Sequence, residues 1–143
     1  MYGLVPYNLS PIQQGIQFGH ALQEYNNNEK LRNQAFDTWR LKDKTFIILN
    51  GGTTNTNDSD IWYGSLNKHA DYLNILLEGE IATFYEPDLG QQLTAVIFLV
   101  SEIVYDKIKY PEQSQDETLQ QYIERLGYKN VALRNFLTNF KFA

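Results

Sequence analysis

The stretch Thr45-Phe-Ile-Ile-Leu49 contains four consecutive apolar residues and has the length of a β-strand. A continuous apolar run is typical of a strand that is buried on both faces. We therefore expect it to lie inside a sheet, as a central strand. The residues that follow, Asn50-Gly-Gly-Thr-Thr-Asn-Thr-Asn-Asp-Ser-Asp60, form the clearest loop of the chain. A buried strand, a polar loop and then a helix are typical of the ligand-binding edge of an α/β sheet.

The residues at the start of the chain, before Thr45–Leu49, predict a strand and the beginning of a helix. Tyr2–Asn8 predicts a short strand, and Pro6 is expected near its end because proline has no N–H to donate. Ser10 as N-cap, Pro11 at the first helical position and Gln13 three residues after the cap predict a capping box. A helix is therefore expected to begin at Pro11.

We expect this first helix to bury one face against the sheet. The residues at helical spacing on that face are Ile12, Ile16, Gly19 and Gln23, with His20 beside them. Glycine in a helix interior costs about 1 kcal/mol relative to alanine. Close packing of the helix on the sheet would explain Gly19. A second helix is expected from Glu29 to Trp39.

The segments after the loop predict two strands and three helices. The elements nearest the loop are a helix over Ile61–Leu77 capped by Gly79, a strand over Ile81–Tyr85, a turn over Glu86–Gly90 and a last strand over Leu93–Val100. A second capping box, Ser114-Gln-Asp-Glu117, predicts a helix that runs to Leu126 and ends at Gly127. Val131–Phe140 predicts a C-terminal helix, on which Phe136 and Phe140 pack into the core.

The order β-α-α-β-α-β-β-α-α predicts an α/β fold. Strands separated by helices pair in parallel through right-handed crossovers, and the short link before the last strand predicts an antiparallel hairpin. We expect one domain over residues 1–143, with a four-stranded mixed sheet and helices on both faces. Its core is expected at residues 2–100, followed by a C-terminal helical extension at 101–143.

Composition narrows the classes of function. The 143 residues carry a net charge of −5, with 12 Lys and Arg against 17 Asp and Glu, which argues against binding to duplex DNA. The absence of cysteine excludes disulfides, thiolate zinc sites and cysteine nucleophiles. No apolar run approaches the roughly 18 residues of a membrane span, and the N-terminus lacks a basic signal region. A cytoplasmic protein without membrane partners is expected.

Few side chains suit catalysis. The two histidines, His20 and His69, do not have the spacing of a metal site, so we expect neither a metal nor another cofactor. The loop at Asn50–Thr53 offers backbone N–H groups and hydroxyls for a phosphate or ribose, or is an ordinary polar turn. Glu86 and Asp88 flank a proline and provide either acid–base chemistry or a charged hairpin turn.

Several motifs support a family resemblance. Gln17-Phe-Gly-His20-Ala21 resembles the Gln-x-x-His-Ala signature of type II peptidyl-tRNA hydrolases, and the element order is similar to that fold. The chain is more closely similar to phage-encoded proteins of this superfamily. The stretches that it shares with them are Leu9–Ala21, Thr45–Thr53, Phe84–Leu89 and Leu93–Ala95. The resemblance covers residues 2–100, and it implies the cytoplasm of an infected bacterium.

The chain departs from the hydrolases at the residue that is catalytic in that family. Gln13 stands where those enzymes have a lysine, and Met1–Glu29 contains neither Lys nor Arg. An amide cannot supply that positive charge. The family's Asp-x-Gly-x-Thr motif is replaced by Glu86-Pro-Asp-Leu-Gly90, whereas Thr94 can stand for a threonine at the start of the last strand. The resemblance therefore implies a retained binding cleft with lost or altered catalysis.

Three functions remain open at this point. The sequence favours a protein that binds a nucleotide or an RNA 3′ end, and the phage resemblance suggests that it sequesters a host nucleotide used as a defence signal. The alternative is an active peptidyl-tRNA hydrolase with His20 or Glu86 as general base. The third is an interaction protein whose polar cleft is incidental.

The ligand-binding residues expected for the first function lie in three segments. They are Ser10, Gln13, Gln17, His20, Asn50, Gly51, Gly52, Thr53, Glu86, Asp88 and Thr94. Cationic contacts to a ligand are expected from Lys68, Arg134 or a second subunit. Exposed strand edges and the aromatic tail are compatible with a homodimer.

Overall fold

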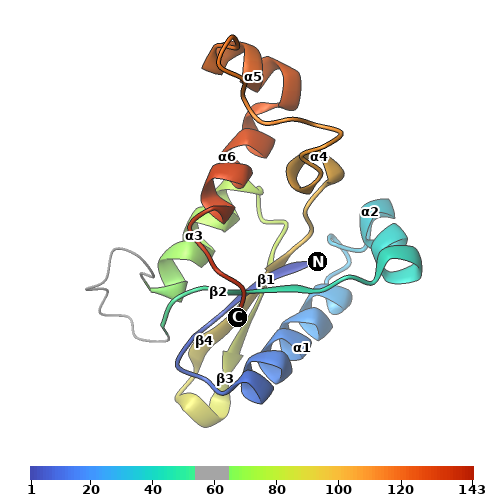
Figure 1. Cartoon of the computed structure of the whole chain (residues 1–143). Coiled ribbons are helices and arrows are strands. Elements are labelled where there is room, and N and C mark those ends of the chain that lie inside the picture. The colour runs from blue at the N-terminus through green and yellow to red at the C-terminus, as the bar shows by residue number, and fades with distance from the viewer. Residues whose placement is uncertain (54–64) are drawn as a thin grey trace. The chain divides into compact units, whose positions relative to one another are not determined.

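The computed structural model describes residues 1–53 and 65–143, and the chain divides into two compact units (Figure 1). The first unit contains Met1–Leu99 together with Phe140–Ala143. The second unit is Val100–Asn139. Residues 140–143, which the sequence assigns to the C-terminal extension, therefore belong with the sheet.

The first unit is built on a four-stranded mixed sheet, as expected. Its strands are β1 (Tyr2–Val5), β2 (Ile47–Asn50), β3 (Ala82–Glu86) and β4 (Gln92–Phe98), in the order β2-β1-β4-β3. The β1–β2 pair is parallel, whereas β4 is antiparallel to both β1 and β3. The hairpin between β3 and β4 confirms the prediction from their short connection.

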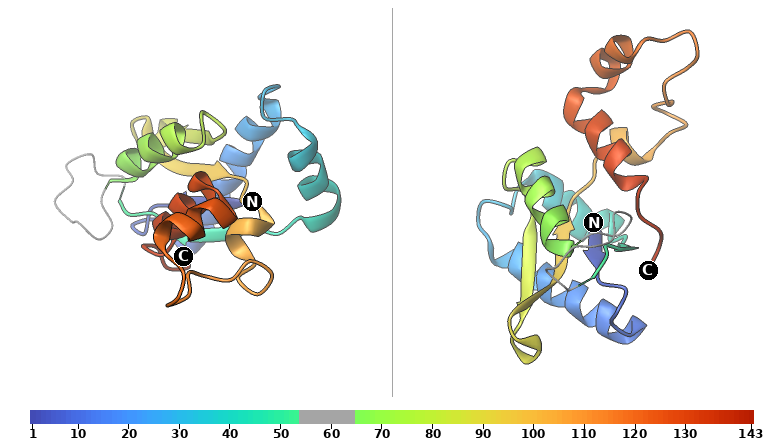
Figure 2. Two further views of the ribbon diagram at one scale, coloured as in Figure 1. Left: turned by 90° about the horizontal axis from the view of Figure 1, so that it is seen from above. Right: turned by 90° about the vertical axis from the view of Figure 1, so that its left-hand side faces the viewer.

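The prediction that Thr45–Leu49 forms a central strand is wrong. The corresponding strand, β2, lies at the end of the strand order. Its outer edge pairs with the end of the chain: Asn50 N donates to Lys141 O at 2.8 Å, and Ala143 N donates to Ile48 O at 3.0 Å. Figures 1 and 2 show the C-terminus beside β2. An edge strand covered by its own chain has the same apolar composition as a central strand, so the sequence does not distinguish them.

The first helix, α1 (Pro11–Asn27), begins as expected but buries a different face. Ser10 Oγ accepts from Gln13 N at 3.2 Å. The residues that face the sheet are Gln14, Gln17, Phe18, Ala21 and Tyr25. Ile12 and Ile16 are 76% and 44% exposed, and a Cβ on Gly19 would meet no atom within 4 Å. The expected apolar face and the role of Gly19 in close packing are therefore wrong.

Hydrogen bonds explain why polar residues occupy the buried face of α1. Gln14 Nε2 donates to Pro6 O at 2.9 Å, and Gln17 Oε1 accepts from Thr94 Oγ1 at 2.6 Å. A buried amide that is hydrogen-bonded avoids most of the cost of desolvation. Hydropathy alone assigns these glutamines to solvent, which is why the sequence predicts the opposite face.

Two helices cover opposite faces of the sheet. A Cβ on Gly3 of β1 would stand 2.3 Å from the Phe18 ring of α1. Leu4, the next residue, points to the other face, where Leu4 and Leu66 of α3 (Leu66–Leu76) both lie against Gly51. The predicted cap at Gly79 is two residues late, because the C-cap of α3 is Leu77 and Glu78, with φ +54°, follows it. Gly79 N then donates to Asn74 O at 2.8 Å. The expected start of this helix at residue 61 lies outside the described residues.

The second predicted helix is shorter and continues into a different turn. α2 (Gln34–Thr38) is followed by a π-helical segment, η1 (Trp39–Asp43), so the expected helix over 29–39 is largely wrong. Asn33 Oδ1 caps α2 by accepting from Phe36 N at 3.0 Å. The Asn33 cap starts the helix later than apolar spacing alone predicts.

Helix α1 packs along β3 and β4 (Figures 1 and 2) and runs opposite to β3. Burial raises the pKa of Tyr25, near the end of α1, to about 12, and the Glu80 carboxylate before β3 acts in the same direction. Nearer its middle, α1 places His20 against Phe84 of β3. The first turns of α1 therefore lie beside the end of β3.

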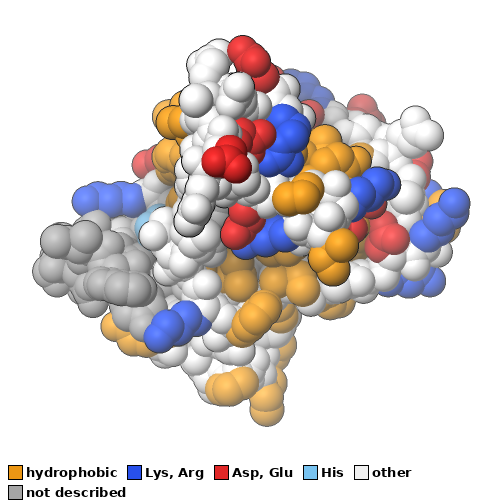
Figure 3. All heavy atoms as spheres, turned by 45° about the horizontal axis from the view of Figure 1, so that its top comes forward, with side chains coloured by type: hydrophobic (Ala, Val, Ile, Leu, Met, Phe, Trp, Pro, Cys, Tyr) orange, Lys and Arg blue, Asp and Glu red, His pale blue; other side chains and the backbone are white. Residues whose placement is uncertain are grey.

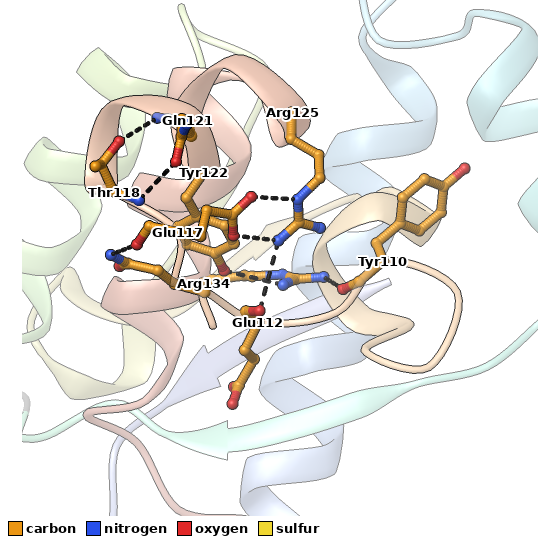
Figure 4. A network of polar contacts seen from close by, with 9 residues as sticks. Tyr110, Glu112, Glu117, Thr118, Gln121, Tyr122, Arg125 and Arg134 are labelled. Carbon is orange, nitrogen blue, oxygen red and sulfur yellow. Dashed lines mark hydrogen bonds and ion pairs between the residues drawn. The ribbon is translucent and has the colours of Figure 1, made fainter. Parts of the chain in front are cut away.

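The second unit is helical and contains α4 (Glu102–Tyr105), α5 (Leu119–Leu126) and α6 (Tyr128–Leu137). The capping box is formed by Thr118 and Gln121, not by Ser114 and Glu117 as predicted. Glu117 is instead paired with Arg125 through two contacts of 2.8 and 2.9 Å (Figure 4). Ser114–Glu117 and Thr118–Gln121 both have the sequence pattern of a capping box. The Glu117 carboxylate binds Arg125 instead, so it does not cap the helix together with Ser114.

The last helix also differs in its bounds from the predicted 131–140. Gly127, with φ +91°, ends α5 as expected, and α6 follows directly. α6 ends at Leu137, so Phe136 and Phe140 are not neighbours on one helix. Phe140 belongs to the first unit, where its ring meets His69 edge-on at 4.9 Å.

A buried arginine organises the second unit (Figure 4). Arg134 is only 5% exposed and donates to three backbone carbonyls and one phenol oxygen. The acceptors are Val104 O at 3.0 Å, Ile103 O at 2.6 Å, Tyr110 O at 2.6 Å and Tyr122 Oη at 3.0 Å. Arg134 thereby joins α4, the following loop, α5 and α6.

The surface of the helical unit carries charges of both signs, which Figure 3 shows close together. Lys107 pairs with Glu112 at 2.8 Å, and Lys109 pairs with Glu102 at 3.1 Å.

In the described part of the chain, no helix is both long enough and apolar enough to span a membrane.

Candidate functional site

Most of the predicted site residues lie at one edge of the sheet. Val5 pairs with Asn50, so the ends of β1 and β2 are side by side. Because β1 and β3 are both antiparallel to β4, β3 ends at the same edge, at Glu86. The first turn of α1 follows β1 there. In open α/β sheets this edge, beyond the carboxyl ends of the strands, is where ligands bind.

Gln17 and Thr94 form the buried floor of this region. Thr94 Oγ1 donates to Gln17 Oε1 at 2.6 Å, and neither residue is more than 2% exposed. The β3–β4 register pairs Phe84 with Ala95 and Tyr85 with Leu93, so Thr94 is an extra residue in β4. The register shift turns Thr94 toward α1. With Oε1 held in this way, the N–H donors of the amide remain on Nε2.

His20 and Phe84 form an aromatic pair one helical turn from Gln17. Their rings are stacked, with centroids 4.5 Å apart and an interplanar angle of 19°. The His20 side chain is exposed, so Phe84 fixes the orientation of an imidazole that solvent or a ligand can reach. Glu86 is two residues after Phe84 and therefore on the same face of β3. The seam between α1 and β3 thus has Gln17 and His20 on the helix and Glu86 further along the strand, on the face that α1 covers.

The Asn50–Thr53 loop, in contrast, uses its polar backbone groups within the chain. Gly51 N donates to Val5 O at 2.8 Å, and Gly52 N lies 3.3 Å from Asn50 Oδ1. Leu66 N donates to Thr53 O at 3.2 Å. A phosphate bound by the two glycine N–H groups would have to displace these partners.

The structure itself explains why glycine occupies positions 51 and 52 of this loop. A Cβ on Gly51 would stand 2.6 Å from Leu4 Cβ and 3.0 Å from Leu66 Cδ1. Gly52 has φ +106°, which side chains disfavour. Packing and backbone conformation therefore account for both glycines without a ligand.

The remaining predicted residues lie around the seam or away from it. Ser10 caps α1, Gln13 is exposed on its first turn, and Asp88 is exposed in the 3₁₀ turn η2 (Pro87–Leu89). Lys68 lies on α3. Arg134 is buried in the helical unit, so the expectation that it contacts a ligand as a free cation is wrong. Its guanidinium already donates to four acceptors.

Phe84 and Gln14 also position the seam, although neither was predicted as a site residue. Phe84 orients His20, and Gln14 connects α1 to the end of β1 through Pro6 O. The spacing of both residues in the sequence indicates that they face the seam. Phe84 precedes Glu86 at the strand period, and Gln14 is spaced with Gln17, Phe18 and Ala21 on one helical face.

Comparison with known proteins adds no relative: no family model, no curated protein and no solved structure matches the chain. Among residues 1–53 and 65–143, no group of three or more His, Asp or Glu side chains lies close enough to hold a metal ion.

Proposed function

We propose that the chain binds a nucleotide or an RNA 3′ end at the seam between α1 and β3. The observation that carries the proposal is the Gln17–Thr94 hydrogen bond beside the His20–Phe84 stack. The resemblance to type II peptidyl-tRNA hydrolases supports it, because Gln17, His20 and Thr94 are the residues that match that family. In a phage-encoded protein such a site would sequester a host nucleotide signal.

Each group of the seam has a role in this proposal. The exposed face of the His20–Phe84 pair stacks on a base, which is favourable for any base because all have a π face. Gln17, which is 2% exposed, supports the seam from below through its hydrogen bond with Thr94. The Glu86 carboxylate accepts from an exocyclic amine or a ribose hydroxyl.

Binding is favoured over catalysis by the distribution of charge. The first cationic side chain in the sequence is Lys30, and Gln13 occupies the first turn of α1. An amide there neither stabilises developing negative charge nor transfers a proton as a lysine does. Peptidyl-tRNA hydrolysis with His20 or Glu86 as general base is the second candidate, favoured by the placement of both residues on one seam.

Calorimetric titration with AMP, GMP, their cyclic forms and a trinucleotide of the tRNA 3′ end tests the proposal. We expect saturable binding of at least one probe to the wild type. His20→Ala should weaken it by about 5- to 150-fold, since base stacking contributes roughly 1–3 kcal/mol. His20→Phe, which keeps an aromatic ring, should retain most of the affinity.

The matched control is Gln23→Ala, one turn further along α1 and exposed, which should leave affinity unchanged. Equal affinity in wild type and His20→Ala would place the ligand elsewhere. No binding of any probe would reject a nucleotide or RNA-end function for this seam.

Peptidyl-tRNA turnover is expected to be absent or at least about 100-fold below that of a lysine-bearing enzyme, because general acid–base groups contribute 10²–10⁴-fold. The measurement is release of peptide from peptidyl-tRNA under single-turnover conditions. Turnover near that of the lysine-bearing enzyme, lost in Glu86→Gln or His20→Ala, would instead establish the hydrolase.

A further inference from the structure

The outward face of α1 has no partner within the described unit. Ile12 is 76% exposed and Ile16 is 44% exposed, and a Cβ on Gly15 or Gly19 would meet no atom within 4 Å. At about 100° per residue these four residues form one stripe, opposite the face that packs on the sheet. Two protruding side chains thus alternate with two open notches.

The charge on this face indicates what can cover it. Residues 1–23 contain no Asp, Glu, Lys or Arg, whereas the whole chain has a net charge of −5. Two copies of an acidic chain repel each other wherever charged surfaces approach. An uncharged helix face is the surface where two copies meet without desolvating charge. A basic partner would find no carboxylate on it.

The spacing of the stripe is self-complementary. We propose that two copies of this chain pack α1 against α1 in antiparallel orientation, about a two-fold axis between Gly15 and Ile16. Ile12 then lies opposite Gly19 of the second copy, and Ile16 lies opposite Gly15 of the second copy. Each isoleucine fills a notch, and the glycines let the helices approach closely, as small residues do at other helix pairs.

The size of the face sets the expected affinity. A helix of 17 residues is about 25 Å long, and one helix pair buries less than the roughly 800 Å² per partner of a standard interface. The dimer should therefore be weak and its population should depend on concentration. The inference does not rest on the proposed nucleotide function.

Sedimentation of the full chain from about 1 μM to about 1 mM tests the proposal. We expect a reversible monomer–dimer equilibrium in the wild type. Gly15→Gln adds a bulky, uncharged side chain of higher helix propensity, so it should weaken the dimer at least about tenfold without weakening the helix. Leu41→Ser, which removes an exposed leucine from η1, is the matched control and should dimerise as the wild type does.

Disulfide formation tests the register, since the chain has no cysteine of its own. Ile12→Cys combined with Gly19→Cys should give an intermolecular disulfide on oxidation, because bridging needs Cα atoms about 4.4–6.8 Å apart. Gln13→Cys with Glu24→Cys, on another side of α1, should stay unlinked. A monomer at every concentration would overturn the proposal. So would a dimer that crosslinks through Thr83→Cys on the outer strand β3 and not through α1.

Discussion

Arg134→Met is expected to lower the stability of the 100–139 unit by roughly 3–5 kcal/mol. Methionine fills a similar volume but donates no hydrogen bond. The carbonyls of Ile103, Val104 and Tyr110 and the Tyr122 hydroxyl would each lose a donor. Each buried acceptor that lacks a donor costs free energy. The bonds of Arg134 also connect three helices, so losing them loosens the packing of α4, α5 and α6. Amide hydrogen exchange within residues 100–139 measures the loss.

Arg125→Met is the matched control in the same unit. Arg125 pairs with Glu117 and lies over the Tyr122 ring at 5.2 Å, but its side chain is partly exposed to solvent. Water can replace the ion pair there, so we expect a clearly smaller loss than for Arg134→Met. Unchanged exchange protection in Arg134→Met would show that the unit does not depend on this network.

Gly51→Ala is expected to destabilise the sheet unit by roughly 2–3 kcal/mol. The added Cβ would lie 2.6 Å from Leu4 Cβ, an atom attached directly to the backbone of β1. It cannot move away without shifting a strand that is paired on both sides. Urea unfolding of the purified variant measures the effect, and an unchanged midpoint would show that this contact is loose.

Gly19→Ala is expected to change the free energy of unfolding in the opposite direction from Gly51→Ala. The Cβ at Gly19 enters open space in a helix interior, where alanine is favoured over glycine by about 1 kcal/mol. We expect a small stabilisation when the measurement is made at a concentration where the monomer prevails. A loss comparable to that of Gly51→Ala would contradict the exposure of the α1 face.

Local sequence signals predicted where most elements of the sheet unit lie. Ser10 and Pro11 predicted the start of α1, and the short Glu86–Gly90 turn predicted the β3–β4 hairpin, because capping and turn formation involve residues close in the chain. The mixed four-stranded sheet followed from the element order. For the candidate site, the element order predicted that the start of α1 and the Glu86–Gly90 turn lie at one edge, whereas Gln17 was expected only from the family resemblance.

Hydropathy failed where a contact distant in sequence changed the environment. Gln14 and Gln17 are buried because Pro6 O and Thr94 satisfy their amides, and Ile12 and Ile16 are exposed as a result. Thr94 is 77 residues from Gln17, so no local pattern reports their bond.

The residues of this sequence specify on their own the α/β class, the approximate elements, the lack of cysteine chemistry and the acidic charge. Tertiary contacts assign the rest. They place β2 at an edge covered by residues 141–143, use Arg134 as an internal donor and bring His20 against Phe84. The reason is physical: propensity, capping and turn chemistry depend on neighbours in the chain. The burial of a polar group depends on whether a partner far along the chain satisfies it.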